Sequence, residues 1–404
     1  MRRWTLIRGL PRFGGFPGFQ TQKPKRHFHS SNALNAVASN VKHVKVRVGS
    51  SGTVTIDLHN VDKESRVPLL VYLPPYSTAS ACKPAKLPRF AQGWPTAVIN
   101  YRWPGFGPFD QQQAAALVSS EGSRGEAYGK SQWPTPIHDV IKAHDWIIHN
   151  PRHFHDAGRD IYVVGSYLGA SLGMALALTE THPRREMGIR GCVAYNGIYN
   201  WTKFLYRHPD YDDYKSPTLL EAVLSRDIPK FQELRRQAKE LFRTTDSLFD
   251  PYASPGLFFH SPGLRPPEFF DDGKDGSKEV NEPSGAVKFP PRSSTLAIPQ
   301  TLLLHSNPPP LPSSVKRELE RHGQGNHRNT FKSQAFELAK SMRSSVVKYD
   351  LKERYGLNHE VRELEAEAKE WVQTYDVTDS SRGYDLSDEA EELAAEWLED
   401  LIPR

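Results

Sequence analysis

Cysteine and long apolar runs are scarce in this sequence. Cys82 and Cys192 are the only cysteines in 404 residues, too few for a disulfide framework or a multi-cysteine zinc site. No apolar run approaches the roughly 18 residues that a membrane-crossing helix needs, so we expect no membrane span. With 38% hydrophobic and 25% charged residues, the chain has the composition of a folded globular protein.

Acidic residues are missing from the first 56 positions, since the first one is Asp57. Seven cations lie in residues 1–35: Arg2, Arg3, Arg8, Arg12, Lys23, Lys25 and Arg26. An arginine-rich, acid-free start with interleaved aromatic residues is typical of a mitochondrial transit peptide. The stretch at 26–31, Arg-His-Phe-His-Ser-Ser, also resembles a processing site. We therefore expect residues 1–35 to be a transit peptide and the protein to be mitochondrial, in the matrix.

The alternative is a basic arm that binds nucleic acid or a membrane surface. The rest of the chain carries a formal charge of −2, seven units below the whole-chain value of +5. The basic excess thus ends with the leader segment, and the folded part shows no sign of a nucleic-acid groove.

Strand and helix patterns alternate along the chain. Residues 44–58 read as an antiparallel hairpin, because apolar residues alternate on both sides of a Gly-Ser-Ser-Gly turn. Short apolar runs suggest buried strands at 67–73, 97–101, 161–164, 192–195, 301–304 and 346–351. Apolar residues at helical spacing suggest helices at 136–148, 168–178, 331–342 and 361–375. We predict an α/β fold whose mainly parallel sheet starts antiparallel and is flanked by helices.

Other stretches interrupt this alternation. Residues 105–132 form a polar insertion, and residues 197–298 read as an inserted helical cap with a disordered loop at about 271–294. The core is then made of residues 42–196 and 299–378. Residues 384–404 hold an acidic C-terminal helix, whose apolar face of Leu393, Trp397 and Leu401 could pack on the core or bind a partner.

The strand–turn–helix at 160–178 carries the clearest chemical pattern. Gly165 and Gly169 supply the two glycines that a strained nucleophile turn requires, two residues before and two after its apex. The residue between them, where a serine would be the nucleophile, is Tyr167. Tyrosine is a poor nucleophile at neutral pH because its pKa is near 10.

The stretch resembles the hormone-sensitive-lipase-like carboxylesterases of the α/β-hydrolase family. The family's Gly-Asp-Ser-Ala-Gly-Gly turn and the helix that follows it align without gaps onto residues 165–178. The family's Tyr-Arg-Leu-Ala-Pro segment is similar to residues 101–104. The Asp, Ala and Trp positions of a helix in the family match Asp139, Ala143 and Trp146. The resemblance covers most of residues 66–360 outside the insertion and much of the cap. It implies the α/β-hydrolase fold with a cap, ester hydrolysis, and a small hydrophobic or acyl ligand under the cap.

The catalytic positions that this resemblance implies are altered. The nucleophile position is Tyr167, and the oxyanion loop falls on Pro75, Tyr76 and Ser77, where proline has no N–H to donate. The acid position is Pro309. His359 alone matches, because it follows the last predicted strand, at 346–351, where the family places its triad histidine.

Two serines could replace the missing nucleophile. Ser171 lies in a literal Gly-x-Ser-x-Gly pattern one helical turn beyond Tyr167, and Ser166 precedes the apex. The simpler interpretation makes Ser171 a small packing residue and His359 a packing or hydrogen-bonding residue. His149, His153 and His155 lie close in sequence, but Pro151 breaks their helical spacing, so we expect neither a metal site nor a cofactor.

Three functions remain open at this point. The changed positions favour a mitochondrial pseudohydrolase with a binding or scaffold role. The alternatives are an active carboxylic ester hydrolase that uses Ser171 or Ser166 with His359, and a structural component of a mitochondrial complex such as the ribosome.

Overall fold

The protein is described here from a computed structural model. The described residues are 41–62, 67–76, 85–103, 132–150, 154, 159–205, 234, 237–270, 285–307, 329–355, 360–378 and 384–402. The predicted transit peptide and the insertion up to residue 131 lie outside them.

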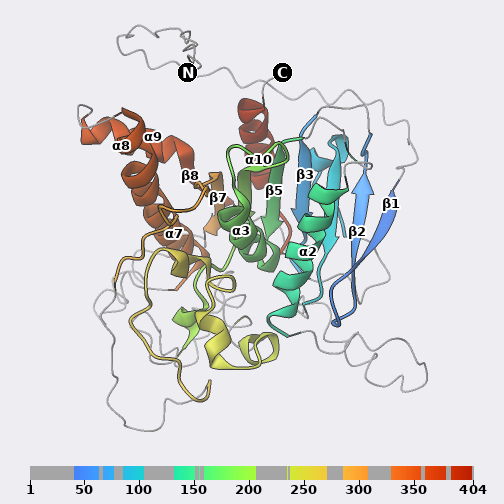
Figure 1. The fold of residues 1–404 in the computed structure, drawn as a ribbon, viewed down its shortest axis with the longest axis horizontal. Coiled ribbons are helices and arrows are strands. Elements are labelled where there is room, and N and C mark those ends of the chain that lie inside the picture. The colour runs from blue at the N-terminus through green and yellow to red at the C-terminus, as the bar shows by residue number, and fades with distance from the viewer. Residues whose placement is uncertain are drawn as a thin grey trace, which may run out of the picture. The chain divides into compact units, whose positions relative to one another are not determined.

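An eight-stranded sheet forms the centre of the molecule (Figure 1). Its strands are β1 (Lys42–Arg47), β2 (Thr53–His59), β3 (Leu69–Leu73), β4 (Thr96–Asn100), β5 (Ile161–Ser166), β6 (Ile189–Tyr195), β7 (Gln300–Asn307) and β8 (Val372–Thr378). They lie in the order β1-β2-β4-β3-β5-β6-β7-β8. The β1–β2 and β2–β4 pairs are antiparallel and all the others are parallel. The predicted fold class, a mainly parallel sheet with an antiparallel start, is confirmed.

Helices cover both faces of this sheet. The α-helices are α2 (Thr135–His149), α3 (Leu168–Glu180), α7 (Phe331–Val346), α8 (Lys352–Tyr355), α9 (Val361–Trp371) and α10 (Asp388–Leu401). Short 3₁₀ turns are η1 (Phe90–Gly93), η3 (Trp201–Phe204), η4 (Thr245–Phe249) and η5 (Pro255–Phe258). Apolar residues of α2, α3 and α7 pack on one face, and those of α10 pack on the other. In Figure 1, α2 and α3 lie in front of the strands and α10 lies behind them.

The chain between α7 and β8 differs from the sequence prediction. Residues 346–351 were predicted as a strand, but α7 continues through them as a π-helical turn, η7 (Val347–Leu351), into α8. The buried residues of α7 include Leu338, Met342 and Val346, spaced four apart, and this stripe holds the segment helical. The predicted helix at 361–375 ends at Trp371, and the last strand is β8.

The described part of the predicted cap packs on the core through aromatic rings. Trp103 and Trp133, from the core, contact Phe242 at centroid distances of 5.6 and 5.9 Å. Trp201 contacts Phe242 at 5.0 Å. Residues 285–294 of the stretch predicted to be disordered are placed against the core, because Ala286 pairs with His260 and Phe289 is buried. Residues 271–284 lie outside the described part of the chain.

Two segments matched by the family resemblance meet in a buried ion pair. Arg102, after β4, donates to both carboxylate oxygens of Asp139 on α2, at 2.9 and 2.6 Å. The Arg102 backbone N–H also donates to this carboxylate, at 2.9 Å. The Asp139 side chain is fully buried and that of Arg102 is 10% exposed. Because a buried charge needs both a partner and hydrogen bonds, this pair fixes α2 to the end of β4.

The acidic helix α10 docks on the sheet. Ala390, Ala394, Trp397 and Leu398 are buried, while Leu393 and Leu401 of the predicted face lie at its margin. The Ser387 hydroxyl caps the helix by accepting from the Ala390 N–H. Among the described residues, no helix combines the length and apolar character needed to cross a bilayer.

Candidate functional site

The turn between β5 and α3 has the strained geometry of a nucleophile elbow. Tyr167 stands at its apex with φ 53° and ψ −114°, a conformation that is uncommon for a residue with a side chain. A Cβ on Gly165 would lie 2.5 Å from the Gly169 carbonyl oxygen. A Cβ on Gly169 would lie 2.3 Å from the carbonyl oxygens of Leu73 and Pro74. Both glycines are therefore required by the close approach of backbone, and we call residues 165–169 the elbow.

Aromatic rings enclose the Tyr167 side chain, which is 1% exposed. The ring of Tyr384, from the segment after β8, lies 4.2 Å away at 33°. The ring of Phe331, at the start of α7, lies 6.3 Å away in an edge-on arrangement. The space above the apex is filled by this cluster of three rings.

The backbone N–H that follows the apex already has a partner. In an active elbow the N–H of the residue after the nucleophile donates to the oxyanion. Here the Leu168 N–H donates to the Pro75 carbonyl oxygen at 3.2 Å. The neighbouring Pro74 carbonyl accepts from the Tyr101 hydroxyl at 2.7 Å, which holds this loop in place. The loop thus presents carbonyl oxygens to the elbow, where an oxyanion site needs N–H donors.

The remaining residues of the predicted oxyanion loop add no donor that the structure describes at the elbow. Pro75 is buried, and the half-buried ring of Tyr76 packs against the main apolar core. Ser77 lies outside the described residues.

The two candidate serines are both buried and hydrogen-bonded. The Ser171 hydroxyl accepts from the Ile198 N–H at 3.0 Å and donates to the Tyr167 carbonyl at 3.4 Å. The Ser166 hydroxyl donates to the Tyr384 carbonyl. Ser171 therefore joins α3 to the chain leaving β6, and Ser166 joins β5 to the segment that carries Tyr384.

The predicted histidine and acid positions lie outside the described residues, at His359 and Pro309. The placement of His359 after the last strand is wrong, because residues 346–351 are helical and His359 precedes α9 and β8 in the chain. The last strand is followed instead by the segment that carries Tyr384.

A histidine–aspartate pair that the sequence did not reveal lies at the carboxyl ends of β7 and β8. His305 and Asp376 are register partners, with 2.8 Å between the Nδ1 and Oδ1 atoms. Lys332 of α7 pairs with the other carboxylate oxygen at 2.8 Å. Burial lowers the pKa of His305 to about 4, against the opposing effect of Asp376, so the ring is neutral at pH 7. The sequence analysis missed this pair because it placed Asp376 just beyond a predicted helix and not on a strand beside β7.

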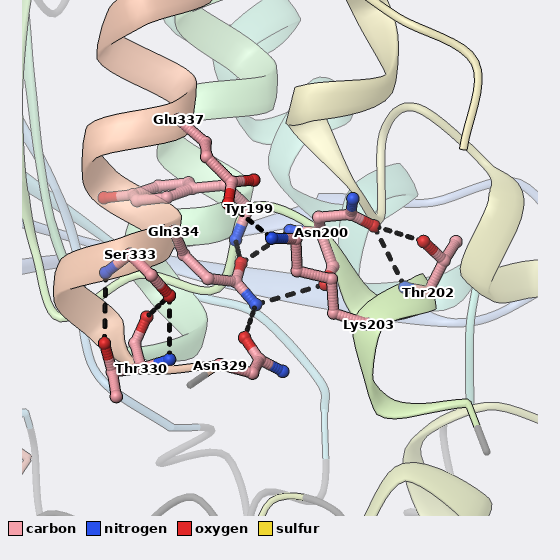
Figure 2. Close-up of polar contacts among 9 residues, drawn as sticks. All are labelled: Tyr199, Asn200, Thr202, Lys203, Asn329, Thr330, Ser333, Gln334 and Glu337. Atoms are coloured by element: carbon pink, nitrogen blue, oxygen red, sulfur yellow. Dashed lines mark hydrogen bonds and ion pairs between the residues drawn. The ribbon is translucent and has the colours of Figure 1, made fainter. Parts of the chain in front are cut away.

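Figure 2 shows how the start of the cap is fastened to α7. The Gln334 side-chain oxygen accepts from the N–H groups of Tyr199 and Asn200, at 2.7 and 2.8 Å. Its nitrogen donates to the Asn200 carbonyl and to Asn329, at 3.2 and 2.9 Å. Lys203, with its side chain 4% exposed, pairs with Glu337 at 2.5 Å. Because both ends of the Gln334 amide are used in this way, the network holds backbone in place and leaves Gln334 nothing to offer a ligand.

Among the described residues, no group of three or more His, Cys, Asp or Glu side chains could hold a metal ion. His149 contacts Asp145 of its own helix, and His153 and His155 lie outside the described ranges.

Comparison with known proteins gives likenesses of structure only. No family model matches the sequence, and no curated protein matches it. The metagenomic thermostable carboxylesterase EstE1 is similar with a TM-score of 0.47 and 14% identity, over 90% of each chain. The esterase LipW of Mycobacterium marinum gives 0.46 and 14%, over 90% of this chain and 81% of that one. The Francisella virulence factor BioJ gives 0.42 and 11%, over 90% and 84%.

Because these identities and TM-scores are low, we identify the fold from the structure of this chain alone. The mainly parallel sheet, its antiparallel start and the glycine-framed elbow between β5 and α3 all agree with the predicted fold. The chain has the α/β-hydrolase fold.

Proposed function

We propose that this protein is a pseudohydrolase, an α/β-hydrolase-fold protein that has no serine-esterase activity and acts as a binding or scaffold protein. One observation carries the proposal: the Leu168 N–H, which would stabilise an oxyanion, is bonded to the Pro75 carbonyl. An ester oxygen would have to displace a hydrogen bond of the protein backbone to reach that N–H.

The expected loss of catalytic rate is large enough to support this proposal. Removal of one oxyanion donor alone costs about 10²–10³-fold in rate. Loss of a triad nucleophile costs roughly 10⁶-fold. Tyr167 is no replacement, because a phenol is a poor nucleophile and this one is enclosed by Tyr384 and Phe331.

The proposal includes a mitochondrial location, supported by the acid-free, arginine-rich residues 1–35. We expect those residues to direct a fused fluorescent protein to mitochondria. The matched control replaces Arg2, Arg3, Arg8 and Arg12 with glutamine. Diffuse fluorescence from the unaltered fusion would contradict the location without bearing on catalysis.

Labelling by a fluorophosphonate probe tests the absence of serine chemistry. We expect the folded full-length chain to stay unlabelled and to hydrolyse p-nitrophenyl butyrate no faster than buffer. Ser166→Ala and Ser171→Ala are compared with Ser293→Ala, a control at an exposed position.

Labelling that disappears in Ser166→Ala or Ser171→Ala but persists in Ser293→Ala would overturn the proposal. Turnover that is lost in His359→Ala would do the same. Either result would establish the alternative, an active ester hydrolase.

A further inference from the structure

A cavity of about 200 Å³ lies between the end of β3, the loop before η1 and the start of α10. It belongs to the face of the sheet that α10 covers, and none of the elbow residues lines it. Its lining residues are Tyr72, Lys86, Leu87, Pro88, Arg89, Asp385, Leu386, Ser387, Asp388 and Glu391.

The charges of this cavity are arranged by depth. Tyr72 is 1% exposed, and Asp385 and Glu391 are half-buried; we call these three residues the floor. Lys86, Arg89 and Asp388 are exposed and form the rim. The floor is therefore acidic and phenolic, and the cations are confined to the rim.

The rim cation Arg89 is held by its neighbours. Its guanidinium pairs with Asp388 at 3.2 Å, and its backbone N–H donates to the Glu391 carboxylate at 2.7 Å. Glu391 is thus positioned by a backbone group, which satisfies one hydrogen bond but supplies no full positive charge.

The phenol of Tyr72 is the observation that points to a ligand. Its hydroxyl makes no hydrogen bond with any residue that the structure describes, although the side chain is buried and lines the cavity. The hydroxyl is open to the cavity that Tyr72 lines, so a guest that hydrogen-bonds to it would gain a contact that no described residue supplies. Asp385 and Glu391 line the same cavity as this phenol, so one guest can meet all three floor groups.

The floor carboxyls indicate the sign of the guest's charge. Burial raises the pKa of Asp385 and of Glu391 above their ordinary values, with Lys86 opposing the rise in both and Arg89 in Glu391. A cation placed among the floor groups would favour their ionised forms, whereas an anion would oppose them.

We propose that this cavity binds a small organic ammonium ion. Its three N–H donors match the acceptors of the floor, which are one phenol oxygen and two carboxylates. Its apolar body packs against Leu87, Pro88 and Leu386, which line the same cavity. This site is separate from the elbow and does not depend on whether the elbow is catalytic.

Calorimetry with three probes of matched shape tests the assignment on the full-length protein. The probes are 2-phenylethylamine, 2-phenylethanol and 3-phenylpropionate at pH 7.5. We expect the amine to bind at least about tenfold more tightly than the other two, since a hydrogen bond to a charged group contributes that much or more.

Variants of the floor locate the binding. Tyr72→Phe and Asp385→Asn should each weaken amine binding about tenfold. The controls are Tyr375→Phe, at an exposed tyrosine on β8, and Asp400→Asn, at an exposed acid of α10. Circular dichroism verifies that every variant is folded.

Equal affinity for the three probes would overturn the proposal, as would the absence of amine binding at millimolar concentration. A loss in the control variants as large as in the floor variants would also overturn it.

Discussion

The elbow and the Arg102–Asp139 pair are two regions that match the family resemblance. The pair keeps the family's residues, whereas the elbow keeps only the backbone and glycines. In the pair, both matched residues are present and meet with full hydrogen bonding. At the elbow the strained backbone and its two glycines are present, but the apex is a buried phenol and the following N–H is bonded to Pro75.

The difference separates what builds this fold from what would do chemistry on it. A buried carboxylate without its guanidinium would cost several kcal/mol, so the pair is needed whether or not the protein is an enzyme. A nucleophile contributes nothing to stability by being reactive, so an aromatic residue that fills space can occupy the apex.

Breaking the pair should have the largest effect. Asp139→Ala removes the carboxylate that pairs with the buried Arg102 guanidinium and should lower the free energy of unfolding by about 3–5 kcal/mol, measured by urea denaturation. Asp145→Ala on the same helix removes an exposed pair with Lys142 and should cost less than about 1 kcal/mol. Similar losses in both variants would remove the structural role that we give to the pair.

A buried histidine on the same helix should make stability depend on pH. Burial lowers the pKa of His144 to about 4, below its ordinary 6.5, and Arg185 acts in the same direction. His144 therefore binds a proton less readily in the folded state than in the unfolded chain. The contribution of neutral His144 to the free energy of unfolding is complete above pH 6.5. That contribution is lost as the pH falls towards 4.

Between pH 7 and pH 4, the free energy of unfolding that His144 contributes should fall by about 3 kcal/mol. His144→Leu should reduce the difference in unfolding free energy between these two pH values by that amount. The control is His149→Leu, whose side chain is 70% exposed, and it should leave the difference nearly unchanged. An unaltered pH dependence in His144→Leu would contradict the assignment.

Two glycines of α3 should respond unequally to an added methyl group. Gly169→Ala brings a Cβ to 2.3 Å from two backbone carbonyl oxygens, which can retreat only if the elbow shifts. We expect a loss of about 1–3 kcal/mol in thermal unfolding, with a changed near-UV spectrum. In Gly173→Ala the nearest atoms are side-chain methyls of Val163 and Leu73, at 3.0 and 3.1 Å, so the loss should be smaller. The opposite ranking would show that the elbow is not tightly packed.

Restoring an alcohol at the apex should have the smallest effect, namely none on activity. Tyr167→Ser supplies the hydroxyl, but the Leu168 N–H remains bonded to Pro75 and no oxyanion donor is gained. We expect hydrolysis of p-nitrophenyl butyrate to stay at the buffer rate at a temperature where the variant is folded. Measurable turnover would show that Tyr167 alone separates this elbow from an active one.

The parts of the fold that follow local periodicity could be predicted from the sequence. The buried strands β3 to β7 are short apolar runs, and the elbow is marked by two glycines at fixed spacing. The end of α7 could not be read in this way. Val346 and Val347 favour a strand as isolated residues, but the apolar stripe that starts at Phe331 carries the helix through them.

The enclosure of the candidate site could not be predicted for a different reason. Strand β8 is a sheet edge whose residues are largely exposed or half-buried, so its alternation is weak, and it reads as the end of the preceding helix. With β8 misplaced, neither the His305–Asp376 pair nor the position of Tyr384 above Tyr167 could be inferred. The bond between Leu168 and Pro75 joins segments 93 positions apart, and no local pattern reports such a contact.

The Ser166–Tyr384 contact makes burial of the apex depend on a distant part of the chain. It spans 218 positions, and its second partner follows the last strand of the sheet. Proteolytic loss of the residues after Thr378 would therefore uncover the Tyr167 ring and expose a surface that the intact fold buries.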